Sequence, residues 1–226
     1  MSGLHHINLV TLFGISINPL RMTMEWCGEG DLFHLIHSEE KSSKVTWKMR
    51  YKIALNIARG MEYLQNVTPP IVHRDLRSPN IFLVSLNEND DVLAKVADFG
   101  LSRHVEHKLS ETLPTWRWLA PEIIDFHSMY YDERSDIYSF AIICWEMIYF
   151  DIPYDEFSSV LIQDVKSSII AGKLRPTLPD LTNPVRFPLF LHSEIFYFFY
   201  HNYLIIMLKF PLFFSRIFCN FTGYLP

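Results

Sequence analysis

Cysteine is scarce in this chain, and the spacing of the few that it has excludes two common uses of this residue. The 226 residues contain three cysteines, Cys27, Cys144 and Cys219, which lie far apart in the sequence. No pair has the short spacing of a zinc site, and there is no disulfide framework of the kind found in small secreted domains. We therefore predict a protein of a reducing compartment, with the cytoplasm as its location.

An excess of basic residues is also missing. The chain has 20 Lys and Arg against 25 Asp and Glu, which gives a formal net charge of −5. Such a balance does not indicate binding to nucleic acid or to an anionic membrane surface. With 49% hydrophobic and 20% charged residues, the composition is that of a globular domain and not of a disordered chain.

No hydrophobic run reaches the roughly 20 residues that a membrane-spanning helix needs. The best candidate, 195–208, contains His201 and Asn202 and is followed by Lys209 and Pro211. A membrane anchor in this part of the chain is therefore only a secondary interpretation.

The composition changes abruptly near the C-terminus. Residues 187–226 hold 14 of the 34 aromatic residues, and Glu194 is their only acidic residue. We predict a partial domain over 1–182 and an atypical hydrophobic, aromatic tail over 183–226. Translated non-coding sequence is our first interpretation of this tail, and a membrane anchor or a hydrophobic cap on the domain are the alternatives.

Strand-like and helical patterns alternate along the first part of the chain. Two strand-like runs come first, 8–16 and 19–26, and a secretory leader is the second reading of the earlier one. Apolar residues at steps of three and four, or on most faces, then predict helices over 47–65, 135–149 and 158–171. Gly172 is a plausible stop for the last helix. A polar linker at 38–43 and short β runs at 71–72, 81–84 and 92–96 lie between them, and 100–120 is loop-like.

Three short motifs occur in a fixed order. His73 to Asn80 matches H-R-D-L-x-x-x-N, Asp98 begins the triplet Asp-Phe-Gly, and Ala120 begins the triplet Ala-Pro-Glu. Each triplet alone is weak evidence, but the ordered set is the signature of a protein kinase.

The residue types in these motifs suit phosphoryl transfer. That reaction needs an acceptor hydroxyl aimed in line and neutralisation of the phosphate charge. Asp75 is a carboxylate that could accept the hydroxyl proton. Asn80 and Asp98 offer the oxygen ligands that Mg²⁺ prefers, together with phosphate oxygens. The sequence therefore predicts a site that uses ATP and Mg²⁺ and acts on a protein substrate.

From about His5 to Pro179 the chain resembles a protein kinase of the tyrosine-kinase-like group, most similar to the Roco family that includes the leucine-rich-repeat kinases. The runs that carry this resemblance are 72–83, 94–102, 135–140 and 174–179. The resemblance implies an α+β, protein-kinase-like fold, mainly its helical C-terminal lobe with remnant strands of the N-terminal lobe. It also implies a serine/threonine kinase activity.

The resemblance further implies roles for individual residues. On the nucleotide side, Met24 would be the gatekeeper, the backbone of Glu25 and Cys27 would bind adenine, Asp31 could reach the ribose, and Phe82 would form the floor of the pocket. Asp136 would hold the catalytic loop through backbone N–H groups.

On the acceptor side, Thr115 would contact the catalytic Asp75 and would favour serine or threonine as acceptor. Arg77 stands where many serine/threonine kinases have lysine, and it keeps the positive charge. Arg74 suggests control by phosphorylation of the activation loop, with Ser102, Ser110 and Thr112 as candidates.

The sequence departs from the family pattern upstream. Glycine is scarce, with eight residues, and Gly28 and Gly30 are not followed by a third glycine, because Phe33 stands at that position. The first lysine is Lys41. These 226 residues thus lack both the glycine-rich loop and the lysine that pairs with phosphates. We expect weak nucleotide binding and little or no transfer by these residues alone.

The sequence also departs from the family pattern downstream. The family pairs the glutamate at Glu122 with an arginine that has no counterpart here. An unpaired buried carboxylate would cost about 3–5 kcal/mol.

Two alternatives to an active kinase remain open. One is a catalytically dead, kinase-like binding module, and the other is a membrane-tethered interaction protein.

Overall fold

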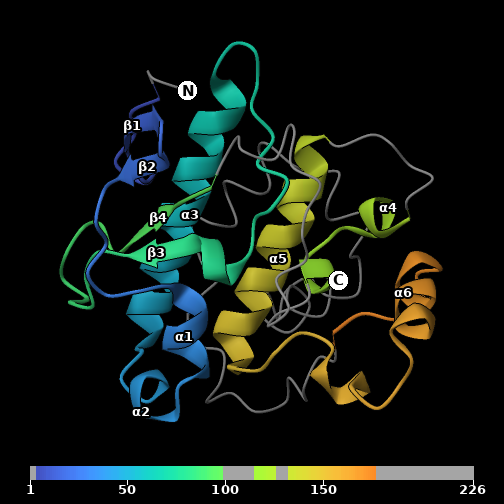
Figure 1. The fold of residues 1–226 in the computed structure, drawn as a ribbon. Coiled ribbons are helices and arrows are strands. Elements are labelled where there is room, and N and C mark those ends of the chain that lie inside the picture. The colour runs from blue at the N-terminus through green and yellow to red at the C-terminus, as the bar shows by residue number, and fades with distance from the viewer. Residues whose placement is uncertain (1–3, 99–114, 126–131, 177–226) are drawn as a thin grey trace, which may run out of the picture. The chain divides into compact units, whose positions relative to one another are not determined.

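The computed structural model describes residues 4–98, 115–125 and 132–176 (Figure 1). Apart from Pro176, these residues belong to one compact unit, Met1–Arg175. The activation-loop candidates Ser102, Ser110 and Thr112, and the tail 183–226, lie outside the described residues.

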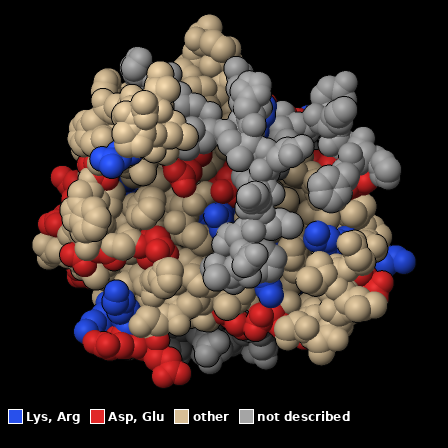
Figure 2. Space-filling view, viewed as in Figure 1, with Lys and Arg blue, Asp and Glu red and all other residues tan. Residues whose placement is uncertain are grey.

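A two-stranded antiparallel hairpin opens the fold. It consists of β1 (Leu12–Ile17) and β2 (Leu20–Met24), so both predicted strands are confirmed, although each is shorter than expected. Its side chains are mostly apolar and yet exposed to solvent. Figure 2 shows this region, at the upper left, as nearly free of charged atoms, whereas acidic and basic side chains are interspersed over the rest of the visible face.

A second small sheet lies in the interior of the unit. β3 (Ile81–Leu83) pairs antiparallel with β4 (Ala94–Val96), and an isolated parallel bridge adds Leu9 beside Val96. The prediction of a further strand at 71–72 is wrong. The backbone N–H of Ile71 instead donates to the carbonyl of Leu64 at 2.9 Å, which satisfies one of the free carbonyls in the last turn of the preceding helix.

The segment between hairpin and long helix is more helical than its sequence suggested. α1 (Leu32–His37) begins at Asp31, whose side chain accepts a hydrogen bond from the backbone of His34. The predicted polar linker contains a one-turn helix, α2 (Glu39–Ser42). Its N-cap is Ser38, a residue type that favours helix starts.

Two long helices form the centre of the unit. α3 (Trp47–Asn66) starts at a Thr46 cap, and α5 (Glu133–Tyr149) starts at an Asp132 cap, which confirms both predicted helices. α3 buries one apolar face, whereas α5 is buried over most of its surface. Figure 1 shows α3 passing behind β3, with α5 beside it.

Arg50 of α3 closes the C-terminal end of α5. Its Nη1 donates to the carbonyl of Ile148 at 3.2 Å, and its guanidinium lies over the rings of Trp47 and Phe150. A cation at this end of a helix is stabilised by the helix dipole. Burial lowers the pKa of Arg50 to about 10, so the group stays charged at neutral pH.

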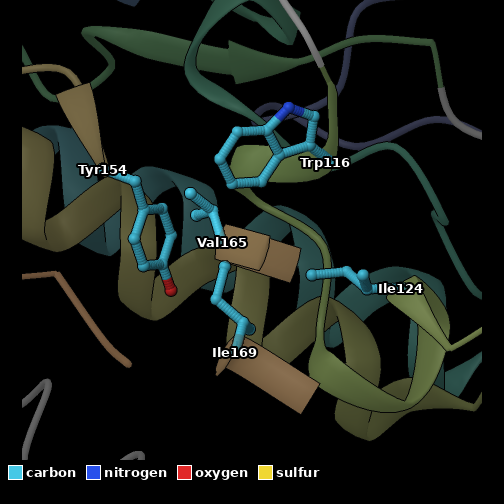
Figure 3. Packing of buried hydrophobic residues seen from close by; sticks show 5 residues of the cluster. All are labelled: Trp116, Ile124, Tyr154, Val165 and Ile169. Atoms are coloured by element: carbon cyan, nitrogen blue, oxygen red, sulfur yellow. The ribbon is translucent and has the colours of Figure 1, made fainter. Parts of the chain in front are cut away.

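The last part of the unit packs around Trp116. It contains three short elements, η2 (Thr115–Arg117), α4 (Pro121–Ile124) and η3 (Asp155–Phe157), and then α6 (Ile162–Ile170). Trp116, Ile124, Tyr154, Val165 and Ile169 form a buried cluster (Figure 3). Gly172 follows α6 with a φ of +71°, as the predicted helix stop requires.

Among the described residues, every helix is too short or too polar to cross a membrane. The segment 195–208 lies outside those ranges.

Gly60 on α3 lets the N-terminal segment approach the helix backbone closely. A Cβ atom at this position would lie 2.8 Å from the carbonyl oxygen of Asn8 and 3.2 Å from a methyl group of Leu9. That segment is fixed on its other side by hydrogen bonds to β4, from Val10 to Val96 and from Val96 to Asn8, both at 2.9 Å.

We expect Gly60→Ala to destabilise the protein, although alanine favours helices. The overlap should cost about 1–3 kcal/mol, more than the roughly 1 kcal/mol gained in helix propensity. Urea unfolding followed by circular dichroism measures the change. Arg59→Ala, at the neighbouring exposed position, is the control and should leave the unfolding free energy nearly unchanged. A stabilised Gly60→Ala protein would contradict the close approach.

Candidate active site

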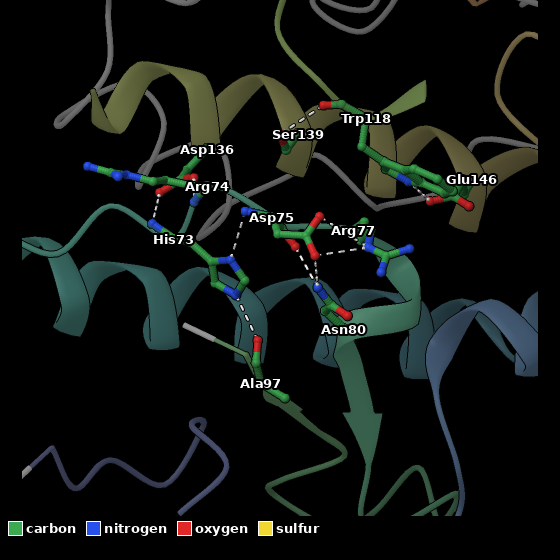
Figure 4. A network of polar contacts seen from close by, with 10 residues as sticks. All are labelled: His73, Arg74, Asp75, Arg77, Asn80, Ala97, Trp118, Asp136, Ser139 and Glu146. Carbon is green, nitrogen blue, oxygen red and sulfur yellow. Dashed lines mark hydrogen bonds and ion pairs between the residues drawn. The ribbon is translucent and has the colours of Figure 1, made fainter. Parts of the chain in front are cut away.

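Asp136 holds the turn that carries the first motif. Its carboxylate accepts hydrogen bonds from the backbone N–H groups of His73, at 2.7 Å, and Arg74, at 2.9 Å. Arg74 has a φ of +70°, a left-handed conformation that is unfavourable for this residue type. Burial raises the pKa of Asp136, while the imidazole of His73 and the two amide donors oppose that shift. The predicted contact between Asp136 and the catalytic loop is confirmed (Figure 4).

His73 joins this loop to the strand that precedes Asp98. The backbone N–H of Asp75 lies 3.3 Å from Nδ1 of His73. Because this N–H group can only donate, Nδ1 must be the acceptor, and the ring proton resides on Nε2. Nε2 then donates to the carbonyl of Ala97 at 2.8 Å. The backbone N–H of Ala97 in turn donates to the carbonyl of Asn80 at 2.9 Å.

These bonds determine where Asp98 lies. It directly follows Ala97, which is bonded to both ends of the loop 73–80, so Asp98 stands next to the loop that carries Asp75 and Asn80. Asp98 is exposed and has a φ of +59°. A non-glycine residue in this conformation is strained, and such strain is typical of functional sites.

Asp75 is held by two side chains of its own loop. Nε of Arg77 lies 3.2 Å from its carboxylate, and Nδ2 of Asn80 donates to the same carboxylate at 2.8 Å and to the Asp75 carbonyl at 2.7 Å. Because Nδ2 of Asn80 faces Asp75, its Oδ1 faces away from this carboxylate. The amide oxygen is thus available to a cation while the nitrogen fixes Asp75.

Two of the residues predicted to bind the nucleotide, Asp31 and Phe82, pair with each other at the edge of β3. Leu83 donates its N–H to the carbonyl of Gly30 at 2.8 Å, and Asp31 forms an antiparallel bridge with Phe82. The segment after the hairpin therefore runs beside the strand that carries the predicted pocket floor. The side chain of Asp31 caps α1 and lies 2.7 Å from Nδ1 of His34, so its contact with a ribose remains a prediction.

The hinge region contains an ion pair that sequence reasoning missed. Glu25 pairs with Lys95 of β4, and its second oxygen accepts from the backbone N–H of Thr11 at 3.1 Å. Burial tends to raise the pKa of Glu25, but the bonds from Lys95 and Thr11 outweigh it and lower the pKa. Lys95 is the cross-strand partner of Phe82, so both belong to the same face of the sheet.

Two other predicted nucleotide residues have less specific surroundings. Met24 ends β2 and is partly exposed. Cys27 is a free, half-buried thiol, and burial raises its pKa, so it stays neutral at physiological pH. Their roles as gatekeeper and hinge remain predictions.

The structure does not join Thr115 to Asp75. Thr115 begins η2, and among the described residues no hydrogen bond links it to the Asp75 carboxylate. Its role in acceptor choice therefore remains a prediction.

The expected cost of an unpaired Glu122 does not apply. Glu122 lies in the first turn of α4 and is only half-buried, so water can solvate its carboxylate. The estimate assumed a fully buried charge, which this residue is not.

A second carboxylate network, also unexpected, lies beside the loop. Glu146 of α5 is completely buried and accepts a hydrogen bond from Oγ of Ser78 at 2.8 Å. It also accepts one from Nε1 of Trp118 at 2.6 Å (Figure 4). Nε2 of His37 lies 3.3 Å from the same carboxylate. Burial raises the pKa of Glu146, and the three hydrogen bonds oppose that shift.

Comparison with known proteins agrees with this geometry. The model of the family described as "Protein tyrosine and serine/threonine kinase" matches residues 1–184. Among curated proteins of Dictyostelium discoideum, the chain is 46% identical over 184 residues to "Probable serine/threonine-protein kinase qkgA" and 48% identical over 180 residues to "Probable serine/threonine-protein kinase roco11". Both alignments cover about 80% of this chain but only 12% of the relative. The resemblance to Roco kinases is thereby confirmed.

We expect Asp136→Asn to loosen the loop that contains Asp75. An asparagine keeps the shape but presents one N–H₂ group to a backbone donor, which should cost about 1–3 kcal/mol. Hydrogen exchange at the amides of His73 and Arg74 should become faster, and the midpoint of unfolding should move to a lower urea concentration. Asp164→Asn, on the exposed side of α6, is the matched control. Unchanged exchange at both amides would contradict the anchoring role.

Proposed function

This chain belongs to the protein tyrosine and serine/threonine kinase family, and on that premise we propose that it provides the catalytic loop and metal-binding residues for phosphoryl transfer from Mg-ATP to a protein hydroxyl. The observation that carries the proposal is the hydrogen-bonded connection between the loop 73–80 and Ala97. It brings a proton acceptor, Asp75, next to two oxygen donors, Asn80 and Asp98.

Asp75 would accept the proton of the acceptor hydroxyl. Its carboxylate is fixed by Arg77 and Asn80 and is only slightly exposed. Fixing a base in this way lowers the entropy cost of reaching an in-line geometry. Arg77 can also place its remaining N–H groups on phosphate oxygens, because a guanidinium offers five donors.

Asn80 and Asp98 would hold Mg²⁺. An amide oxygen and a carboxylate are the hard donors that this ion prefers, and Mg²⁺ usually keeps waters and phosphate oxygens as its other ligands. No cluster of three or more His, Cys, Asp or Glu side chains occurs within the described ranges. Bound Mg²⁺ would supply neutralisation of phosphate charge.

Serine or threonine is the acceptor that the relatives support. The names of the similar Dictyostelium proteins describe serine/threonine-protein kinases. Because the chain spans about a tenth of the length of these relatives, the substrate of the whole protein stays a proposal.

A cytoplasmic location is likewise proposed, and the free thiols of Cys27 and Cys144 support a reducing environment.

A kinase-like binding module is the second candidate. The exposed apolar side chains of the β1–β2 hairpin favour it, since patches of this kind often mark interaction sites. The measurement of metal-dependent nucleotide binding below separates the two candidates.

We expect the chain to bind an ATP analogue weakly and only with Mg²⁺. Asp98→Asn should raise the dissociation constant about tenfold or more, a loss of roughly 1.4 kcal/mol, because a metal ligand loses its charge. Asp75→Asn should bind as the parent does, because this residue acts on the hydroxyl. Isothermal calorimetry with and without Mg²⁺ checks both. Binding that is independent of Mg²⁺ and of Asp98 would contradict the proposal and favour the binding module.

Transfer to a serine-containing generic substrate should be slow or undetectable with these 226 residues. The lysine and the glycine-rich loop that hold the phosphates have no match in them, and the family mechanism needs that lysine. A radiolabelled-phosphate assay, with Asp75→Asn as the blank, measures the rate. Rapid turnover that Asp75→Asn abolishes would support the catalytic role of Asp75 and contradict the need for the lysine.

A further inference from the structure

Glu146 connects four parts of the molecule that are far apart in the sequence. Its carboxylate, on α5, is met by Ser78 from the catalytic loop, Trp118 from the segment after η2 and His37 from the end of α1. The carboxylate is completely buried, and the His37 side chain is 11% exposed. The phosphoryl-transfer residues proposed above do not include any of these four side chains.

One of the three partners of Glu146, Ser78, lies next to the proposed chemistry. Ser78 directly follows Arg77, which holds the Asp75 carboxylate. Trp118 is held at a second point, because Oγ of Ser139 donates to its carbonyl at 2.8 Å. Any change in the charge of Glu146 therefore acts on the loop of Asp75 and on the segment that begins with Thr115.

His37 is the group that can change that charge balance. Trp118 and Ser78 donate neutral hydrogen bonds, whereas an imidazole can exist in a neutral or a cationic form. A buried carboxylate is expensive unless it is paired, so a charge 3.3 Å away affects it strongly. The His37 ring also packs at a tilt against Phe33, with ring centroids 4.3 Å apart, which limits its freedom to turn away.

Other ionisable groups on the elements around this pair are directed elsewhere. Arg77 faces Asp75, Arg50 binds the carbonyl of Ile148, Arg117 pairs with Asp155, His34 pairs with Asp31, and Glu39 and Glu40 are exposed. Burial raises the pKa of the Cys144 thiol, two residues before Glu146, to about 12, so it remains neutral. Within the described residues, His37 is thus the titratable side chain in hydrogen-bonding distance of Glu146.

We propose that His37 is a positioning residue that acts through Glu146 on Ser78 and Trp118, so that its protonation adjusts the acceptor side of the site. When His37 gains a proton, the Glu146 carboxylate is shared with a cation and is a weaker acceptor for the Trp118 indole. The description of this region as the acceptor side rests on the proposed function. The coupling itself does not, because it needs neither nucleotide nor turnover.

The indole N–H signal of Trp118 in the full chain reports the coupling. We would label the five tryptophans with ¹⁵N, assign Trp118 with a Trp118→Phe variant, and titrate from about pH 5 to 8. The Trp118 indole proton should move upfield as the pH falls, with the same midpoint as the His37 imidazole in the same sample. His37→Gln should abolish that shift.

Two variants serve as controls. His34→Gln changes the exposed histidine of the same helix and should preserve the Trp118 shift. Glu146→Gln keeps the volume and removes the charge, and it should abolish the shift even though His37 is present. The four other indole signals show that each variant is folded. A Trp118 signal that does not respond to pH in the parent, or that responds equally in His37→Gln, would overturn the proposal. A failure to bind Mg-ATP would instead count against the proposed function and leave this result standing.

Discussion

The two hydrogen bonds from the catalytic loop to Asp136 are the constraint on which the rest of the site depends. They point two successive backbone N–H groups at one buried carboxylate, and Arg74 adopts an unfavourable backbone conformation to allow it. With the turn fixed there, His73 reaches Ala97, and Asp75, Asn80 and Asp98, the residues proposed to accept the proton and to hold Mg²⁺, lie in adjacent segments. A charge-assisted bond in a low-dielectric interior is strong enough to maintain such strain.

α5 provides this anchor because its polar residues lie on one face. Asp136, Ser139 and Glu146 are separated by three and seven residues, which places them on the same side of a helix with 3.6 residues per turn. Asp136 binds the turn at His73, Ser139 binds the Trp118 carbonyl, and Glu146 binds Ser78 and the Trp118 indole. Beyond its first turn, the rest of the helix is largely apolar, and most of it is buried. The helix therefore acts as a rigid support to which both sides of the site are attached.

Sequence patterns predicted the elements that long, regular periodicity specifies, and the site residues that fixed motifs contain. The helices at 47–65 and 135–149 were confirmed almost to the residue, as was the contact of Asp136 with the loop.

The Glu25–Lys95 pair could not be predicted, because 70 residues separate its members and only the pairing of β3 with β4 brings Lys95 into place. The alternation of Lys95 with buried Ala94 and Val96 was the one available signal. Glu146 looked like an ordinary member of an apolar helix, and its partners come from three other elements. The error at 71–72 arose because an apolar pair can also close a helix end.

The hairpin has a consequence for handling the protein. Both of its strands have a free outer edge among the described elements, and side chains such as Ile17, Leu20 and Trp26 are more than four-fifths exposed. Open edges with apolar flanks are templates for pairing between molecules, and natural sheets usually protect them with charge, proline or a covering segment. The hairpin offers only Arg21 and the Pro19 turn for this purpose. The tendency of this chain to associate and precipitate should therefore increase with protein concentration. Intermolecular sheet formation would begin at the hairpin.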